Sequence, residues 1–189
     1  MKPLILASKS PRREELLQKI TDDFEIIVSD VDEVLPSDIT CEEAPVYLAA
    51  LKANAVAREH PGSVVIGSDT VVILDGVILG KPKDEDDAFS MLRRLSGKTH
   101  TVITGCCITD GKNERRFSDS TQVTFYELTD EEIQKYIATG DPMDKAGSYG
   151  IQEKGTLFVK GIVGDFFNVM GLPIAKLFRE LREFEVNGK

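Results

Sequence analysis

Residues 64–82 read VVIGSDTVVILDGVILGKP. The apolar runs at 64–67 and 71–74 have the composition of strands that are buried on both faces of a sheet. The small polar residues 68–70 separate these runs and predict two buried strand segments interrupted by an acid, Asp69. Because a buried carboxylate is costly unless it is paired, hydrogen-bonded or bound to a metal, we take Asp69 as the candidate chemical centre of the protein.

The second half of this stretch predicts a β-hairpin. Asp75-Gly76 lies between two apolar runs, which is a strong sequence signal for a two-residue turn. The returning strand, 77–80, is followed directly by Lys81. We therefore expect the hairpin to bring the ammonium group of Lys81 back toward Asp69.

Composition and charge narrow the class of protein. The chain has 189 residues, which suits one domain, 1–189, with a substantial core. Its formal net charge of −9 disfavours nucleic acid and anionic membranes as partners. Cys41, Cys106 and Cys107 show neither a disulfide framework nor zinc-ligand spacing, and no segment approaches a membrane span. We predict a cytoplasmic protein that holds anionic ligands with local basic clusters.

An anion site is predicted at the start of the first helix. A short buried strand, 4–7, leads through Ser8 into a helix whose first residue is Pro11, a favoured place for proline. Arg12 and Arg13 add their charges to the partial positive charge of the helix N-terminus. The alternative is that the arginines only pair with neighbouring acids. We favour anion binding because two arginines occur together there.

The acids that follow the second predicted strand, 24–29, are candidate metal ligands. Asp30, Asp32 and Glu33 place three carboxylates in four positions, and carboxylate oxygens suit a hard cation such as Mg²⁺. The alternative is a solvated acidic turn, because no calcium-loop spacing is present. From the residues alone, all three acids stay open as ligands.

The next helix carries a candidate cation, Lys52. The capping-box pattern that begins at Thr40 predicts a helix from there to about residue 60, while Pro45 allows a start near that proline instead. Lys52 adjoins the apolar face of this helix and can point inward. A solvent-exposed position is nevertheless the usual one for lysine.

The rest of the chain alternates helical and strand patterns. We expect, in order, a helix capped by Asp84, strands at 99–109 and 117–126, a helix from Thr129 to about Gly140, a strand within 155–161 and a helix from Pro173. The turn-rich segment 141–153 carries Lys145, Tyr149 and Gln152, which can line a pocket. These elements predict a mixed α/β architecture in two lobes with a cleft between them.

Considered together, the polar residues indicate phosphate chemistry. The donors that face Glu33 and Asp69 in this hypothesis are Ser8, Arg12, Arg13, Lys52, Lys81 and Lys145. Cations neutralise phosphate oxygens, carboxylates hold a divalent metal, and one carboxylate can orient or deprotonate the attacking water. The sequence has no P-loop motif and no Ser-His-acid or Cys-His pairing. It therefore favours metal-assisted hydrolysis of a phosphoanhydride in a small anionic ligand.

Four motifs, in this order, resemble those of the Maf family: LASKSPRR at 6–13, SDT at 68–70, GKP at 80–82 and GSYGIQ at 147–152. The likeness covers essentially the whole chain. It implies an elongated, two-lobed α/β fold, with a mixed sheet, flanking helices and a central cleft, similar to that of inosine triphosphate pyrophosphatases. It also implies a house-cleaning nucleoside triphosphate pyrophosphatase that uses a divalent metal, Mg²⁺ or Mn²⁺. The family is further linked to inhibition of septum formation and suggests a homodimer.

The resemblance also implies a role for each matched residue. Asp69 would accept a proton from water, with Glu33 beside it at the metal and with Lys52 and Lys81 beside the phosphates. The triphosphate would be bound by Ser8, Arg12 and Arg13.

Base selection is implied by the same resemblance. Arg12, Thr70 and Gln152 match the subgroup that acts on dTTP and UTP, with modified pyrimidine triphosphates as further candidate substrates. The amide of Gln152 can read a pyrimidine edge through one donor and one acceptor. Two alternatives stay open: a nucleotide-binding regulator of cell division without catalysis, and a pyrophosphatase for purines of the ITP type.

Overall fold

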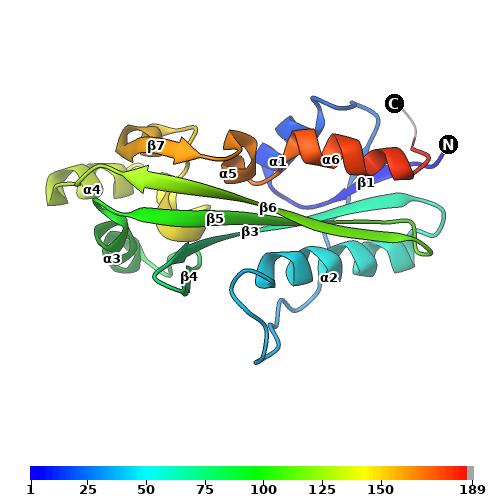
Figure 1. The fold of residues 1–189 in the computed structure, drawn as a ribbon, viewed down its shortest axis with the longest axis horizontal. Helices are drawn as coiled ribbons and strands as arrows, with labels where there is room; N and C mark the ends of the chain where they lie inside the picture. Colours follow the sequence, from blue (N-terminus) through cyan, green and yellow to red (C-terminus); the bar gives the residue numbers. More distant parts are fainter. Residues whose placement is uncertain (187–189) are drawn as a thin grey trace. The chain divides into compact units, whose positions relative to one another are not determined.

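A computed structural model describes residues 1–186 as a mixed α/β protein (Figure 1). In chain order, its strands and α-helices are β1 Leu4–Ala7, α1 Pro11–Leu17, β2 Glu25–Ile26, α2 Ala44–Glu59, β3 Val64–Leu74, β4 Val77–Leu79, α3 Glu85–Leu95, β5 Thr99–Thr109, β6 Glu114–Phe125, α4 Asp130–Ile137, β7 Val159–Val163, α5 Phe166–Met170 and α6 Ile174–Glu180. Short 3₁₀ helices occupy Asp141–Asp144, Ala146–Ser148, Lys154–Phe158 and Leu181–Glu183.

Seven strands of the described residues form a mixed sheet in the order β2-β1-β3-β5-β6-β7, with β4 paired to β3. Strand β1 runs parallel to both β2 and β3. Strand β4 is antiparallel to β3, and β7 is antiparallel to β6. The prediction of a mixed sheet with flanking helices is confirmed.

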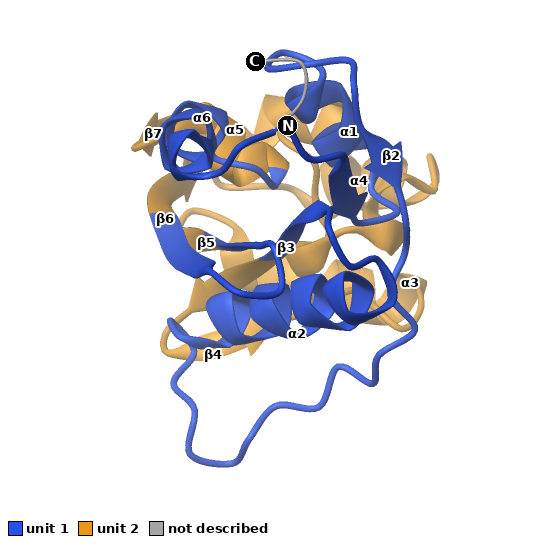
Figure 2. Cartoon of the chain, turned by 90° about the vertical axis from the view of Figure 1, so that its right-hand side faces the viewer, with its two compact units in different colours: residues 1–69, 104–119, 171–189 blue, residues 70–103, 120–170 orange. Residues whose placement is uncertain are grey.

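The chain divides into two compact units, which are coloured separately in Figure 2. The first comprises residues 1–69, 104–119 and 171–189, and the second comprises residues 70–103 and 120–170. Within the first unit, α2 covers one face of β1 and the start of β3, whereas α1 and α6 lie on the opposite face (Figures 1 and 2). Within the second unit, α3 contacts α4.

Two glycines let α2 lie very close to the sheet. A Cβ atom built on Gly67 of β3 would lie 2.1 Å from the carbonyl oxygen of Ala49 and 2.9 Å from the Cβ of Ala53. On the neighbouring strand β5, a Cβ on Gly105 would lie 2.3 Å from the carbonyl carbon of Pro45. Glycine on the strands and alanine on the helix thus remove side-chain volume from both surfaces. This close approach determines where the side chains of α2 meet β3.

The structure corrects one prediction for the central stretch. Strand β3 is continuous from Val64 to Leu74, so the predicted interruption at 68–70 is wrong. The ladder is made by backbone groups, and small polar side chains do not remove them. Successive side chains point to opposite faces of a strand, and Ser68 is fully buried while Asp69 is half-buried.

The predicted hairpin is confirmed. Leu74 pairs with Val77 across the turn, antiparallel. Asp75 and Gly76 have φ values of 52° and 76°. Positive φ at both central residues is the conformation of the turn that matches the twist of paired strands.

The start of α2 follows the alternative near Pro45. The backbone N–H of Glu43 donates to the Oγ1 of Thr40 at 3.2 Å, and the N–H of Thr40 donates to the Oε2 of Glu43 at 3.1 Å. The capping contacts therefore form, but the helix itself begins at Ala44. Proline is tolerated in a first turn because its missing N–H has no partner there.

Candidate functional site

The carboxylate of Asp69 is paired with a lysine from α2. The Nζ of Lys52 lies 2.7 Å from Oδ1 of Asp69 and 3.0 Å from Oε2 of Glu33. The side chains of Lys52 and Asp69 are 13% and 14% exposed, whereas that of Glu33 is 50% exposed. One ammonium group thus holds two carboxylates, and the contact favours Glu33 among the three acids that the sequence left open.

Local packing explains why Lys52 reaches Asp69. Ala53, the next residue of α2, sits directly against Gly67. Asp69 is two residues after Gly67 in β3, and residues i and i+2 of a strand share a face. The lysine and the acid are therefore brought together by the same helix–strand contact. Sequence spacing left the direction of Lys52 open, and the structure turns it inward.

A second cluster surrounds the guanidinium of Arg13 in α1. Its Nε donates to the carbonyl oxygen of Gly171 at 2.9 Å, and its Nη1 donates to the Oγ of Ser8 at 3.2 Å. The buried hydroxyl of Ser68 donates to the same Gly171 oxygen at 3.1 Å. These contacts orient Arg13 in the first unit, where Asp69 also lies.

Charges around Arg13 connect the two clusters. Burial lowers the pKa of Arg13 from its ordinary value, and the negative charge of Asp69 is the strongest effect that opposes this shift. Glu33 also opposes it, whereas the positive charge of Arg12 adds to it. Arginine keeps its proton at ordinary pH. The guanidinium is therefore a fixed cation within electrostatic reach of Asp69.

Three residues to which the family resemblance gives a role belong to the second unit. Thr70 follows Asp69 directly in β3 and is half-buried. Lys81 lies two residues beyond Leu79, the end of β4, and is exposed. Gln152 is also exposed. Their participation in the site around Asp69 stays a prediction.

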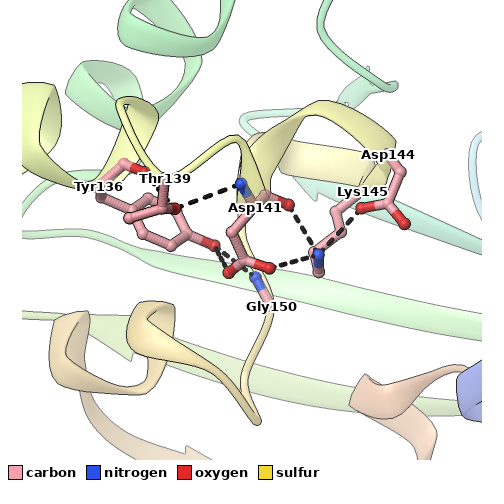
Figure 3. A network of polar contacts seen from close by, with 6 residues as sticks. All are labelled: Tyr136, Thr139, Asp141, Asp144, Lys145 and Gly150. Atoms are coloured by element: carbon pink, nitrogen blue, oxygen red, sulfur yellow. Dashed lines mark hydrogen bonds and ion pairs between the residues drawn. The ribbon is translucent and has the colours of Figure 1, made fainter.

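The structure gives Lys145 a different role from the one expected. Its Nζ donates to the carbonyl oxygen of Asp141 at 2.6 Å, to Oδ1 of Asp141 at 2.8 Å and to Oδ1 of Asp144 at 2.9 Å (Figure 3). A lysine ammonium has three N–H donors, and these three bonds engage them. Lys145 is therefore a structural cation rather than one that is available to phosphate.

Tyr149 is likewise part of the core. Its side chain is 5% exposed. The Tyr149 hydroxyl lies 2.7 Å from Nε2 of His100, and its ring packs edge-on against Phe125.

The carboxylates fit a divalent cation of the magnesium type. Among residues 1–186, no group of three or more His, Cys, Asp or Glu side chains is arranged to hold a metal ion. Mg²⁺, however, commonly uses one or two protein carboxylates and completes its coordination with water and substrate phosphates. Glu33 and Asp69, which converge on the Nζ of Lys52, supply such a pair.

Sequence reasoning missed two features of the site. Gly67 determines the approach of α2, and its isolated position inside an apolar strand pattern is a known sign of close backbone approach. The carbonyl oxygen of Gly171, which accepts from both Arg13 and Ser68, gave no signal in the sequence because any residue carries a carbonyl.

The described part of the chain contains no helix with the length and apolar character needed to cross a membrane.

Comparisons with known proteins find relatives over almost the whole chain. A family model described as Maf-like protein matches residues 3–184. The chain is 52% identical over 185 residues to a dTTP/UTP pyrophosphatase of Bacillus cytotoxicus, covering 98% of this chain and 97% of the relative. It is also 52% identical over 185 residues to a dTTP/UTP pyrophosphatase of Bacillus velezensis, with 98% of each chain covered.

A solved structure supports the fold. The Ham1 protein of Staphylococcus aureus superposes with a TM-score of 0.54 and 17% sequence identity, over 96% of this chain and 99% of that chain. At this identity, the likeness concerns the fold alone.

Proposed function

The chain belongs to the Maf family, and on that premise we propose that it is a nucleoside triphosphate pyrophosphatase that hydrolyses dTTP and UTP to the monophosphate and pyrophosphate. The observation that carries this proposal is the Lys52–Asp69 pair, which presents a half-buried carboxylate within electrostatic reach of Arg13. A base next to fixed cations is what attack by water on a phosphoanhydride requires.

Substrate binding is assigned to the start of α1. Ser8 and Arg13 are held in one orientation by their mutual hydrogen bond and by the Gly171 carbonyl. A guanidinium that is already oriented loses little freedom when it binds a phosphate oxygen. We assign Arg12, which precedes Arg13 in the same turn, to the triphosphate as well.

Water activation is assigned to Asp69. Lys52 bonds to Oδ1 of this carboxylate, and we assign Oδ2 to the attacking water. The water attacks the α-phosphorus, its proton passes to Asp69, and the bond from the α-phosphorus to the bridging oxygen breaks. Lys52 and the exposed Lys81 stabilise the negative charge that develops on the phosphate oxygens and on the departing pyrophosphate.

Glu33 and Asp69 are the residues that would hold a divalent cation, Mg²⁺ or Mn²⁺. Such an ion supplies charge neutralisation of the phosphate oxygens when it is bound. The Glu33 side chain is 50% exposed, so it would be accessible to such an ion.

Base selection is assigned to Arg12, Thr70 and Gln152. The amide of Gln152 carries both a donor and an acceptor, which suits the N3–H and O4 groups shared by thymine and uracil.

The cytoplasm stays the predicted location, and a homodimer stays a prediction of the family resemblance. The formal net charge of −9 disfavours nucleic acid as a partner. It is compatible with a small anionic ligand that is held at a local cationic site.

A direct test uses purified protein with Mg²⁺ or Mn²⁺ and a panel of dTTP, UTP, CTP, dATP, GTP and ITP. We expect pyrophosphate release to be fastest with dTTP and UTP. If ITP dominates, the substrate class is a purine triphosphate instead. If nucleotide binds without any release of pyrophosphate, the protein is a nucleotide-binding regulator and the enzymatic proposal fails.

A further inference from the structure

A buried polar network in the second unit surrounds the segment that leads to Gln152 (Figure 3). The hydroxyl of Tyr136, in α4, donates to Oδ2 of Asp141 at 2.8 Å and accepts from the backbone N–H of Gly150 at 3.0 Å. Asp141 and Lys145 are joined by the two bonds described above. The Tyr136 hydroxyl is therefore bonded on one side to the backbone of Gly150 and on the other to the Asp141–Lys145 ion pair.

Two members of the network are shielded from water. Tyr136 is 4% exposed and Lys145 is 8% exposed. Burial raises the pKa of Tyr136 above its ordinary value, and the neighbouring negative charge of Asp141 acts in the same direction. The Tyr136 hydroxyl thus stays protonated and remains a donor to Asp141. In a buried setting, a network whose groups are all satisfied favours one arrangement of the chain.

Close packing leaves no room for a side chain at position 150. A Cβ on Gly150 would lie 2.6 Å from Cε of Lys145. A Cβ on Gly155 would lie 2.5 Å from the Gly150 carbonyl oxygen and 3.0 Å from the Tyr136 hydroxyl. The Lys145 stem and Gly155 therefore pack closely around Gly150, in addition to its hydrogen bond with Tyr136.

The same segment is bonded to the loop that carries Lys81. The backbone N–H of Gly147 donates to the carbonyl oxygen of Gly80 at 3.0 Å, and Gly80 directly precedes Lys81. At its other end, the segment passes from Gly150 through the buried Ile151 to Gln152. One segment, 147–152, thus connects the loop of Lys81 with Gln152, the residue assigned to the nucleobase.

We propose that Tyr136, Asp141 and Lys145 are positioning residues for base selection, because their network holds the backbone of 147–152 in the one conformation that lets Gln152 read a pyrimidine. This inference rests on the proposed function. None of the three residues needs to touch the substrate. Their effect is to keep the segment in its binding-competent state, and the apparent affinity falls in proportion when that state becomes less populated.

The test compares Tyr136→Phe with the native enzyme. This change removes only the hydroxyl and keeps the ring that packs edge-on against Phe158. If the fraction of enzyme molecules whose segment 147–152 is in the binding-competent state falls to about a tenth, KM for dTTP rises about tenfold while kcat changes little. CTP presents N3 as an acceptor and an amino donor, the reverse of the pattern of thymine, so it is mismatched to a Gln152 amide that is held in the orientation that reads thymine. We expect the preference for dTTP over CTP to narrow by about the same factor.

A double-mutant cycle identifies the residue through which Tyr136 acts. In a Gln152→Ala background, Tyr136→Phe should change KM less than about twofold, because the two effects are not independent. Asp141→Asn, which keeps an acceptor for Tyr136 but weakens the pair with Lys145, should reproduce the KM change. Tyr126→Phe is the matched control, because that side chain is 54% exposed and lies outside the network.

The outcomes separate the two proposals. If the native enzyme releases no pyrophosphate from dTTP or UTP, the proposed function fails and this inference fails with it. If the native enzyme is active but Tyr136→Phe keeps its KM and its preference for dTTP, only the positioning role is overturned. An equal KM change with and without Gln152, or a fall in kcat at constant KM alongside a lower Tm, would assign Tyr136 to stability alone.

Discussion

The ammonium nitrogen of Lys52 lies 2.7 Å from Oδ1 of Asp69, and both side chains are largely shielded from solvent. The pair joins a helix to the middle of a strand at the point where Gly67 removes all side-chain volume between them. The position of the Asp69 carboxylate, the proposed general base, therefore depends on the tertiary packing of α2 against β3 as well as on its place in the sequence.

Asp69→Asn should remove most of the turnover. The amide cannot accept a proton from water at neutral pH, and general base catalysis contributes about 10²- to 10⁴-fold in rate. We expect kcat for dTTP to fall within that range, with a native circular dichroism spectrum. Asp75→Asn is the matched control, because Asp75 lies at the exposed hairpin turn with φ of 52°, which asparagine tolerates. Turnover that survives in Asp69→Asn would transfer the role of base to another group.

Arg13→Lys should weaken substrate binding. A lysine keeps the charge but cannot bond to Gly171 and Ser8 through a planar fork while it also faces a phosphate. Hydrogen bonds to charged groups contribute about 1.5–3 kcal/mol, so KM should rise about tenfold or more. Arg58→Lys, an exposed site near the end of α2, serves as the control. An unchanged KM in steady-state pyrophosphate assays would argue against the phosphate role of Arg13.

Gly67→Ala should destabilise the protein and reduce its activity together. The new methyl group would overlap the Ala49 carbonyl oxygen, so α2 must move away from β3 and carry Lys52 with it. Overpacking of this kind costs about 1–3 kcal/mol, which urea unfolding can measure. Gly161→Ala, where a Cβ would meet nothing within 4 Å, should leave both properties close to native. A stable and fully active Gly67→Ala protein would show that α2 can shift without consequence for the Lys52–Asp69 pair.

His100 should make stability depend on pH. Burial lowers its pKa from 6.5 to about 4, so between these values the unfolded chain binds a proton that the folded protein does not. The free energy of unfolding should therefore fall as the pH falls from about 6.5 to 4, by up to about 1.4 kcal/mol per pH unit.

Two histidine variants separate the pH dependence of stability that is due to His100 from the pH dependence that is due to the carboxylates. His100→Gln should flatten the pH dependence of urea unfolding over this window. The matched change His60→Gln, at the end of α2, should leave the native slope. Equal slopes for the native protein and His100→Gln would mean that His100 titrates normally in the folded state.

Much of the fold could be predicted from the sequence, because its signals are local. Asp75-Gly76 specified the hairpin through the positive φ that both residues adopt. The helix predicted from Thr129 forms as α4, and the Thr129 side chain caps its start. Where the predictions failed, a longer-range effect prevailed: neighbouring strands keep β3 continuous across Asp69 although the apolar pattern breaks there.

The candidate site was predicted less completely, because side-chain direction and charge pairing are not local properties. Arg12 and Arg13 were recognised from their place at a helix start, yet the partners of Arg13 come from Ser8 and from Gly171, 158 residues away. Lys145 has the composition of a phosphate ligand, but the structure surrounds it with Asp141 and Asp144. A charge in a sequence does not reveal whether its partner is a substrate or another residue.

By itself, then, the sequence determined the kind of chemistry: an acid inside a buried strand, basic residues at a helix start, and ordered motifs that identify the family. Only the tertiary structure decided which groups meet. Lys52 reaches Asp69 because glycine and alanine let α2 touch β3, and Tyr136 reaches Gly150 because the segment between them folds back on α4. The physical reason is that propensity and turn chemistry act over a few residues, whereas close packing and charge pairing act between residues that are distant in the chain.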